Sequence, residues 1–188
     1  QRANLHAGSG RERGLQCRTF AAKWVAIQKE EIQRLGRVYL YNGSPEIARQ
    51  PFQKIEIGKA EKLKNGTALV VLTTGTMAQN AADALLLSEN SEAIAHYDFK
   101  FIKPLDEELL HELFQKFHTI ITLEDGVATG GFGSAVAEFA AAHQYQNRLK
   151  ILGIPDEFIA QGTVEELQRY SKLDAKSLQI LFDYYVKS

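Results

Sequence analysis

Cysteine is almost absent from this chain, because Cys17 is the only one among 188 residues. A single cysteine excludes an intramolecular disulfide and any metal site built from several thiolates. Scarce cysteine is typical of reducing compartments, and we therefore expect a cytoplasmic protein.

The chain has no excess of positive or negative charge, and it has no long apolar run. Its formal net charge is −1, so no overall field attracts nucleic acid or an anionic membrane. No apolar stretch could span a bilayer, and the polar residues 1–14 contain no apolar signal-peptide core. We expect neither nucleic acid nor membrane as a partner. The 45% of hydrophobic and 24% of charged residues suffice for the core of a soluble globular domain.

Two parts of the chain differ in character. Residues 1–51 form an atypical N-terminal segment with one helix-like run at 20–35, and residues 52–188 are predicted to form the domain. In that domain short apolar runs alternate with amphipathic segments. We predict strands at 68–72, 93–97, 119–123 and 149–153. Helices are predicted at 77–88, with Leu85 and Leu87 among the residues of its buried face, at 130–143 and from 174, and also from Asp106 and Thr163 as N-caps.

Alternating strands and helices predict right-handed βαβ units. The expected fold class is α/β: a three-layer α/β/α sandwich with a mostly parallel sheet. Ligands of such sheets bind at the carboxyl ends of the strands. Three loops qualify as candidate sites, at residues 73–76, 100–106 and 124–133.

Two of these loops carry motifs of a known family. Residues 96–106 read HYDFKFIKPLD, which resembles the D-x-R-F-x-K-P-L-D segment of transketolase-type C-terminal domains. Residues 121–126 (ITLEDG) and 130–135 (GGFGSA) resemble the T-x-E-[ED]…G-G-x-G-S segment of the same domains. Both motifs occur in the right order within alternating structure, so the resemblance extends over residues 52–186.

The last part of the chain indicates which of the families with such a domain the sequence resembles. Residues 152–163 read LGIPDEFIAQGT, similar to the G-[IL]-P-D-x-F-I-x-x-G-[TS] ending of the 1-deoxy-D-xylulose-5-phosphate synthase family. The resemblance implies a transferase that joins pyruvate to glyceraldehyde 3-phosphate with loss of carbon dioxide, for isoprenoid and thiamine precursors. It also implies a thiamine diphosphate and magnesium cofactor, a homodimer, and an antiparallel edge strand at residues 55–64.

The residues that carry the family's chemistry are missing from this sequence. The cofactor motif, Gly-Asp-Gly with a downstream Asn, has no counterpart, since Glu124–Asp125–Gly126 follows Leu123. Residues 39–43 (YLYNG) stand where the family has R-Y-P-R-G, and neither Tyr nor Asn replaces a phosphate-binding arginine. We therefore expect a truncated or rearranged chain, or one with a non-native N-terminal part, that binds no cofactor and is inactive alone.

No catalytic, cofactor-binding or metal-binding residue is predicted, but a loop or interface site is. Gly131 and the pair Thr74 and Gly75 could offer free N–H groups to an anion. A tight turn is the favoured interpretation of these glycines, because no cation follows them. Glu124 and Asp125 could form an acid/base pair or a cation site. Adjacent residues on a strand point in different directions, so a structural or interface role is expected instead.

Three further side chains complete the candidate set. Lys100 and Lys103 could attract a phosphate, although an ordinary surface or interface ion pair is the favoured interpretation. His96, near a strand end, is the one histidine worth testing as a general base. We expect His111 and His118 to lie on a solvated helix face.

Three hypotheses follow from the sequence. The first is the third domain of the synthase, with the missing domains of the same enzyme as its partner. The second is a non-catalytic dimerisation or partner-binding module derived from that domain. The third, ranked last, is a small-molecule binder of flavodoxin-like architecture that uses loops 73–76 and 130–133.

Overall fold

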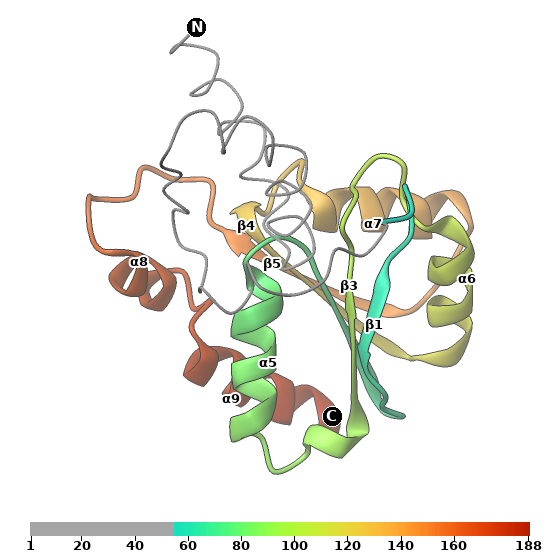
Figure 1. Ribbon diagram of the computed structural model, residues 1–188, viewed down its shortest axis with the longest axis horizontal. Helices are drawn as coiled ribbons and strands as arrows, with labels where there is room; N and C mark the ends of the chain where they lie inside the picture. The colour runs from blue at the N-terminus through green and yellow to red at the C-terminus, as the bar shows by residue number, and fades with distance from the viewer. Residues whose placement is uncertain (1–54) are drawn as a thin grey trace, which may run out of the picture. The chain divides into compact units, whose positions relative to one another are not determined.

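Residues 55–188 are described by a computed structural model (Figure 1). The predictions that fall on residues 1–54 lie outside the described residues: the helix at 20–35, the segment at 39–43 and Cys17. Among residues 55–188, no helix has the length and apolar character needed to cross a bilayer.

A five-stranded sheet forms the centre of the described part, in the order β1-β3-β2-β4-β5. Three of its pairings are parallel, and β1 runs antiparallel to β3 at the edge. The α/β class, the mostly parallel sheet and the antiparallel edge strand are therefore confirmed. The strands are β1 (Glu61–Lys64), β2 (Leu69–Thr73), β3 (Ile94–Asp98), β4 (Thr119–Val127) and β5 (Arg148–Ile154).

Helices cover both faces of this sheet (Figure 1). The side chains of α6 and α7 pack on one face, and those of α5 and α9 pack on the other. The helical segments are α5 (Met77–Leu87), η2 (Ser91–Ala93), α6 (Glu107–Lys116), α7 (Phe132–Ala142), α8 (Val164–Tyr170) and α9 (Ala175–Lys187).

Three helices start where the sequence predicts, and two of them have the predicted caps, Asp106 and Thr163. Asp106 precedes α6 and accepts a hydrogen bond from the N–H of Leu109. Thr163 and Glu166 form a reciprocal capping box at α8, and Asp174 accepts from the N–H of Ser177 at α9. Side-chain oxygens at these positions satisfy N–H groups that have no partner inside the helix.

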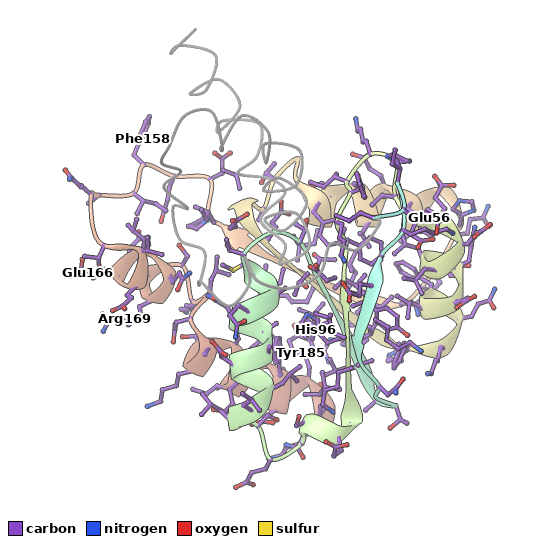
Figure 2. All side chains as sticks on the ribbon, in the orientation of Figure 1. Glu56, His96, Phe158, Glu166, Arg169 and Tyr185 are labelled. Carbon is purple, nitrogen blue, oxygen red and sulfur yellow. The ribbon has the colours of Figure 1, made fainter. Side chains whose placement is uncertain are left out.

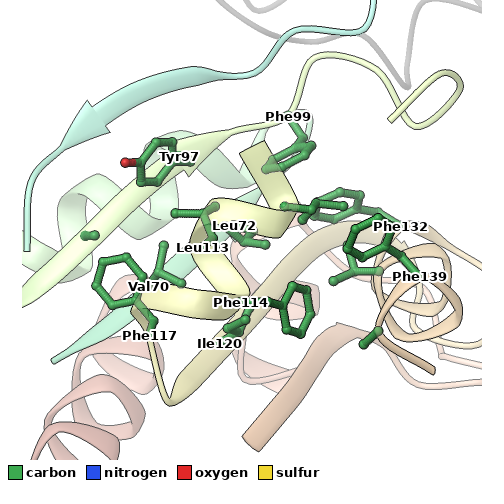
Figure 3. Close-up of a cluster of buried hydrophobic side chains, with 14 residues drawn as sticks. Val70, Leu72, Tyr97, Phe99, Leu113, Phe114, Phe117, Ile120, Phe132 and Phe139 are labelled. Carbon is green, nitrogen blue, oxygen red and sulfur yellow. The ribbon is translucent and has the colours of Figure 1, made fainter. Parts of the chain in front are cut away.

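Two apolar clusters fill the layers between sheet and helices. The cluster under α6 and α7 is aromatic, as Figure 3 shows, and includes Phe99, Phe114, Phe117 and Phe132. The cluster under α5 and α9 is mainly aliphatic, with Phe182 as its one buried ring. Successive strand residues alternate between the two clusters, because side chains along a strand point to opposite faces.

Two predictions about helix faces were wrong. Leu87 was expected on the buried face of α5, but it is 58% exposed near the end of that helix. His111 was expected in solvent, but it is half-buried, and its Nδ1 lies 2.7 Å from the Tyr145 hydroxyl. Its ring also packs against Phe139 and His143. Phe139 lies in α7, and His143 and Tyr145 follow that helix, so the pattern of α6 alone could not reveal these contacts.

Candidate functional site

The loops that follow β2, β3 and β4 meet at one edge of the sheet. These strands are neighbours in parallel register, so their carboxyl ends lie together. The N–H of Thr74 donates to the carbonyl of Leu123 (3.1 Å), and the N–H of Phe99 donates to that of Thr73 (2.7 Å). The edge formed by these loops is the candidate site.

Glu124 ends the buried part of β4 and caps α7. Its carboxylate accepts hydrogen bonds from the N–H groups of Phe132 and Gly133, each at 2.9 Å. The side chain is almost fully buried. Glu124 therefore occupies the position that an anionic ligand would take at this helix N-terminus, and its predicted structural role is supported by geometry.

The glycines of this loop make room for that carboxylate. A Cβ on Gly131 would lie 2.0 Å from Glu124 Oε2, and one on Gly133 would lie 2.4 Å from a methyl carbon of Ile151. Gly130 has a φ of +79°, a conformation that favours glycine. The loop is shaped by close packing, in agreement with the favoured interpretation of its glycines.

Asp125 points to the other face of the sheet and binds the loop after β2. Its carboxylate accepts a hydrogen bond from the Thr76 hydroxyl at 2.7 Å. Gly75, with a φ of +69°, lies against the same carboxylate. Thr74 is buried beside them. The negative charge of Asp125 disfavours an anion at the start of α5.

The two candidate lysines lie after β3 and are not part of this hydrogen-bonded group. Lys100 forms an ion pair with Glu61 of the edge strand, which is the kind of contact expected for it. Lys103 is exposed to solvent and precedes a cis peptide bond to Pro104.

The structure reveals a polar cluster that the sequence did not: Thr73, His96 and Asp98, which lie in β2 and β3. All three side chains are buried, and His96 is 1% exposed. The Thr73 hydroxyl oxygen lies 2.9 Å from His96 Nε2 and 3.1 Å from Asp98 Oδ1. Register brings them together, since Thr73 is paired with Asp98 in the parallel ladder. Of the three, only His96 was singled out from the sequence.

Burial shifts the protonation equilibria of this cluster. It lowers the pKa of His96 to about 4, so that the imidazole is neutral at neutral pH. It raises the pKa of Asp98 to about 6, against the opposing effects of the Thr73 hydrogen bond and the charge of Lys100. Both shifts favour the uncharged form of a buried group.

The arrangement does not fit nucleophilic catalysis. A catalytic hydroxyl needs a base on one side and an exposed approach for substrate on the other. Here the Thr73 hydroxyl is fully buried, and the hydrogen bond of Asp98 is to that hydroxyl and does not orient the imidazole as a base. His96 is also too buried to reach a substrate, so the general-base hypothesis gains no support.

Other parts of the described chain offer little for a ligand. Within residues 55–188, no three side chains of His, Cys, Asp or Glu are placed to hold a metal ion. A shallow depression of about 260 Å³ lies between β1 and α6, and its lining includes Lys59, Asp106 and Glu108. Lys59 forms ion pairs with both Asp106 and Glu108. Asp106, at the end of the candidate loop 100–106, is part of this lining.

Comparison with known proteins agrees with the fold and the loop motifs. Residues 58–178 match the family described as transketolase, C-terminal domain. The chain belongs to this family.

Its curated relatives include 1-deoxy-D-xylulose-5-phosphate synthases. The proteins of Bacteroides thetaiotaomicron and Porphyromonas gingivalis are 47% and 46% identical to it over 130 and 127 residues. These matches cover 68% and 66% of this chain but 20% of each relative. The resemblance inferred from the motifs is thereby confirmed, and the chain spans about a fifth of the length of these relatives.

A solved structure of a split-gene transketolase, described as an inactive β4 tetramer, is similar in fold. The TM-score is 0.62 at 25% identity, and the match covers 73% of this chain and 44% of that one.

Proposed function

We propose that this chain is the C-terminal domain, residues 52–188, of a thiamine-diphosphate-dependent 1-deoxy-D-xylulose-5-phosphate synthase, and that it is inactive alone. The observation that carries the proposal is the extent of the match, about a fifth of each synthase. The remaining four fifths of such an enzyme are the proposed source of the cofactor and substrate sites. A cytoplasmic location and a homodimeric enzyme belong to the same proposal.

The geometry of the loops supports a structural role for this domain. The carboxylates of Glu124 and Asp125 are bound within the chain, to α7 and to the loop after β2. The ammonium of Lys100 is paired with Glu61. Charged groups that have partners within the chain hold loops in place and are not arranged to bind a ligand. We therefore assign the domain a role in the packing and assembly of the enzyme.

The proposal is tested by adding this chain to a separately produced synthase that lacks its C-terminal fifth. Calorimetry of the chain alone with thiamine diphosphate and magnesium should give no binding heat. The mixture should form 1-deoxy-D-xylulose 5-phosphate from pyruvate and glyceraldehyde 3-phosphate, while either part alone should not. Turnover or micromolar cofactor binding by the chain alone would contradict the proposal.

The alternative is a non-catalytic module that dimerises or binds a partner. Its supporting observation is the set of large apolar side chains in solvent. Phe158 is fully exposed before α8 and projects from its loop (Figure 2), and Leu86 and Tyr184 are exposed on α5 and α9. Light scattering over a concentration series distinguishes the two, because a dimer of the isolated chain with no complementation would favour the module.

A further inference from the structure

The Thr73 hydroxyl has more hydrogen-bond partners than it has protons. Its oxygen lies 2.9 Å from His96 Nε2, 3.1 Å from Asp98 Oδ1 and 3.3 Å from the carbonyl oxygen of Tyr97. A threonine hydroxyl donates one hydrogen bond and accepts up to two. The direction of each bond therefore depends on which neighbours carry protons.

Two of the hydrogen-bond patterns open to the cluster differ in the tautomer of His96. When Asp98 is ionised, the hydroxyl donates to its carboxylate, and neutral His96 must carry its proton on Nε2 to donate to the hydroxyl oxygen. When Asp98 is protonated, its own O–H can donate to the hydroxyl oxygen. The Thr73 hydrogen is then free to turn toward His96 Nε2, which accepts it only if the imidazole proton sits on Nδ1.

We propose that the Thr73 hydroxyl couples the protonation of Asp98 to the tautomer of His96, so that the three side chains form a pH-sensitive relay at the carboxyl edge of the sheet. The net change is one proton taken from solvent by Asp98. The imidazole stays neutral, losing a proton at Nε2 and gaining one at Nδ1. This property belongs to the chain itself and stands independently of the enzyme proposed above.

The charges around the cluster come from β1, from the loop after β3 and from the end of β4. Glu61 and Lys64 are the register partners of Asp98 and His96 in β1. Glu61 is paired with Lys100, and Lys64 with Glu92. Asp125 is held by Thr76. The buried residues of α5 and α9 on this face are apolar, so burial dominates the behaviour of Asp98.

The test is nuclear magnetic resonance of the full 188-residue chain, with ¹⁵N-labelled histidine and ¹³C-labelled aspartate. The Asp98 carboxyl should titrate near pH 6, as its raised pKa requires. Over the same interval His96 should change from mainly the Nε2–H to mainly the Nδ1–H tautomer, with the same midpoint. A His96 tautomer that stays constant while Asp98 titrates would overturn the relay, as would an Asp98 that does not titrate between about pH 4.5 and 8.

Three variants separate coupling through the hydroxyl from a direct electrostatic effect. Thr73→Ser keeps the hydroxyl and should keep the tautomer change, whereas Thr73→Val should abolish it while Asp98 still titrates. Asp98→Asn removes the titrating group and should make the tautomer of neutral His96 independent of pH, which keeps the relay testable if Thr73→Val does not fold. A tautomer change that persists in Thr73→Val with an unchanged midpoint would contradict the proposal.

Discussion

Two threonines show how much a single hydroxyl depends on its surroundings. Thr73 and Thr122 lie in β2 and β4, and both are 0% exposed. The Thr73 hydroxyl contacts His96 and Asp98, whereas the Thr122 hydroxyl has no hydrogen-bond partner within residues 55–188. A buried polar group without a partner loses its hydration with no compensation.

Thr122→Val is therefore expected to stabilise the chain by about 1 kcal/mol, because it removes an uncompensated hydroxyl at nearly constant shape. Thr73→Val is the matched control and should destabilise it by about 1–2 kcal/mol. Urea unfolding of both variants measures the difference. If Thr122→Val lost as much stability as Thr73→Val, a partner for the Thr122 hydroxyl would have to exist.

Asp98 carries a penalty for being ionised in a buried position. Burial raises its pKa from 3.8 to about 6, so at neutral pH the folded state is disfavoured by about 3 kcal/mol relative to a neutral side chain. Asp98→Asn keeps an oxygen that accepts from Thr73 and should stabilise the chain by up to that amount at about pH 7.5. The gain in urea unfolding free energy should vanish near pH 4, and a gain independent of pH would contradict this explanation.

Within residues 55–188, the start of α7 depends on a side chain that is distant in sequence. Helices α6, α8 and α9 are capped by the residue just before them, namely Asp106, Thr163 and Asp174. The residue before α7 is Gly131, which has no side chain to offer. Glu124, from β4, bonds the first N–H groups instead.

Replacing Glu124 should therefore cost more than removing a local cap. Glu124→Ala leaves two buried N–H groups without a partner and is expected to destabilise the chain by about 3 kcal/mol, with Glu124→Gln retaining about half of the interaction. Thr163→Ala, at the exposed start of α8, is the control and should cost about 1 kcal/mol. Equal costs for Glu124→Ala and Thr163→Ala would show that Glu124 does not hold α7.

At the scale of the whole molecule, two buried groups contribute to the free energy of unfolding with opposite dependence on pH. Because the pKa of Asp98 is raised, the destabilisation by its buried carboxylate decreases as the pH falls from about 6 toward 3.8 and the group takes up a proton. His96, with its pKa lowered from 6.5 to about 4, costs stability as the pH falls between these values, because the unfolded state takes up the proton first. Over the shared window their contributions to the free energy of unfolding nearly cancel.

Each single variant should remove one of these two contributions and so reveal the other in the pH dependence of stability. Between about pH 6.5 and 4, Asp98→Asn should lose about 3 kcal/mol more stability than the unmodified chain, and His96→Gln should lose about 3 kcal/mol less. The double variant should follow the unmodified chain again. Urea unfolding at several pH values tests this, and four identical pH profiles would rule it out.

The sequence by itself determined the order of the elements, the parallel sheet and three helix starts. These depend on local properties: β-branched apolar runs for strands, and Asp106, Thr163 and Asp174 as caps, each acting within three or four residues of itself. It also determined the family, because the loop motifs at residues 96–106 and 121–135 are contiguous in the chain.

Only the tertiary structure decided which side chains from different strands meet. The register of β2 against β3 places Thr73 beside Asp98, and a shift of one residue would have sent Asp98 to the opposite face. The path of the chain after β4 brings the start of α7 to Glu124, which makes this carboxylate the cap of that helix. The buried relay and this cap both depend on contacts between residues distant in sequence, which no local pattern encodes.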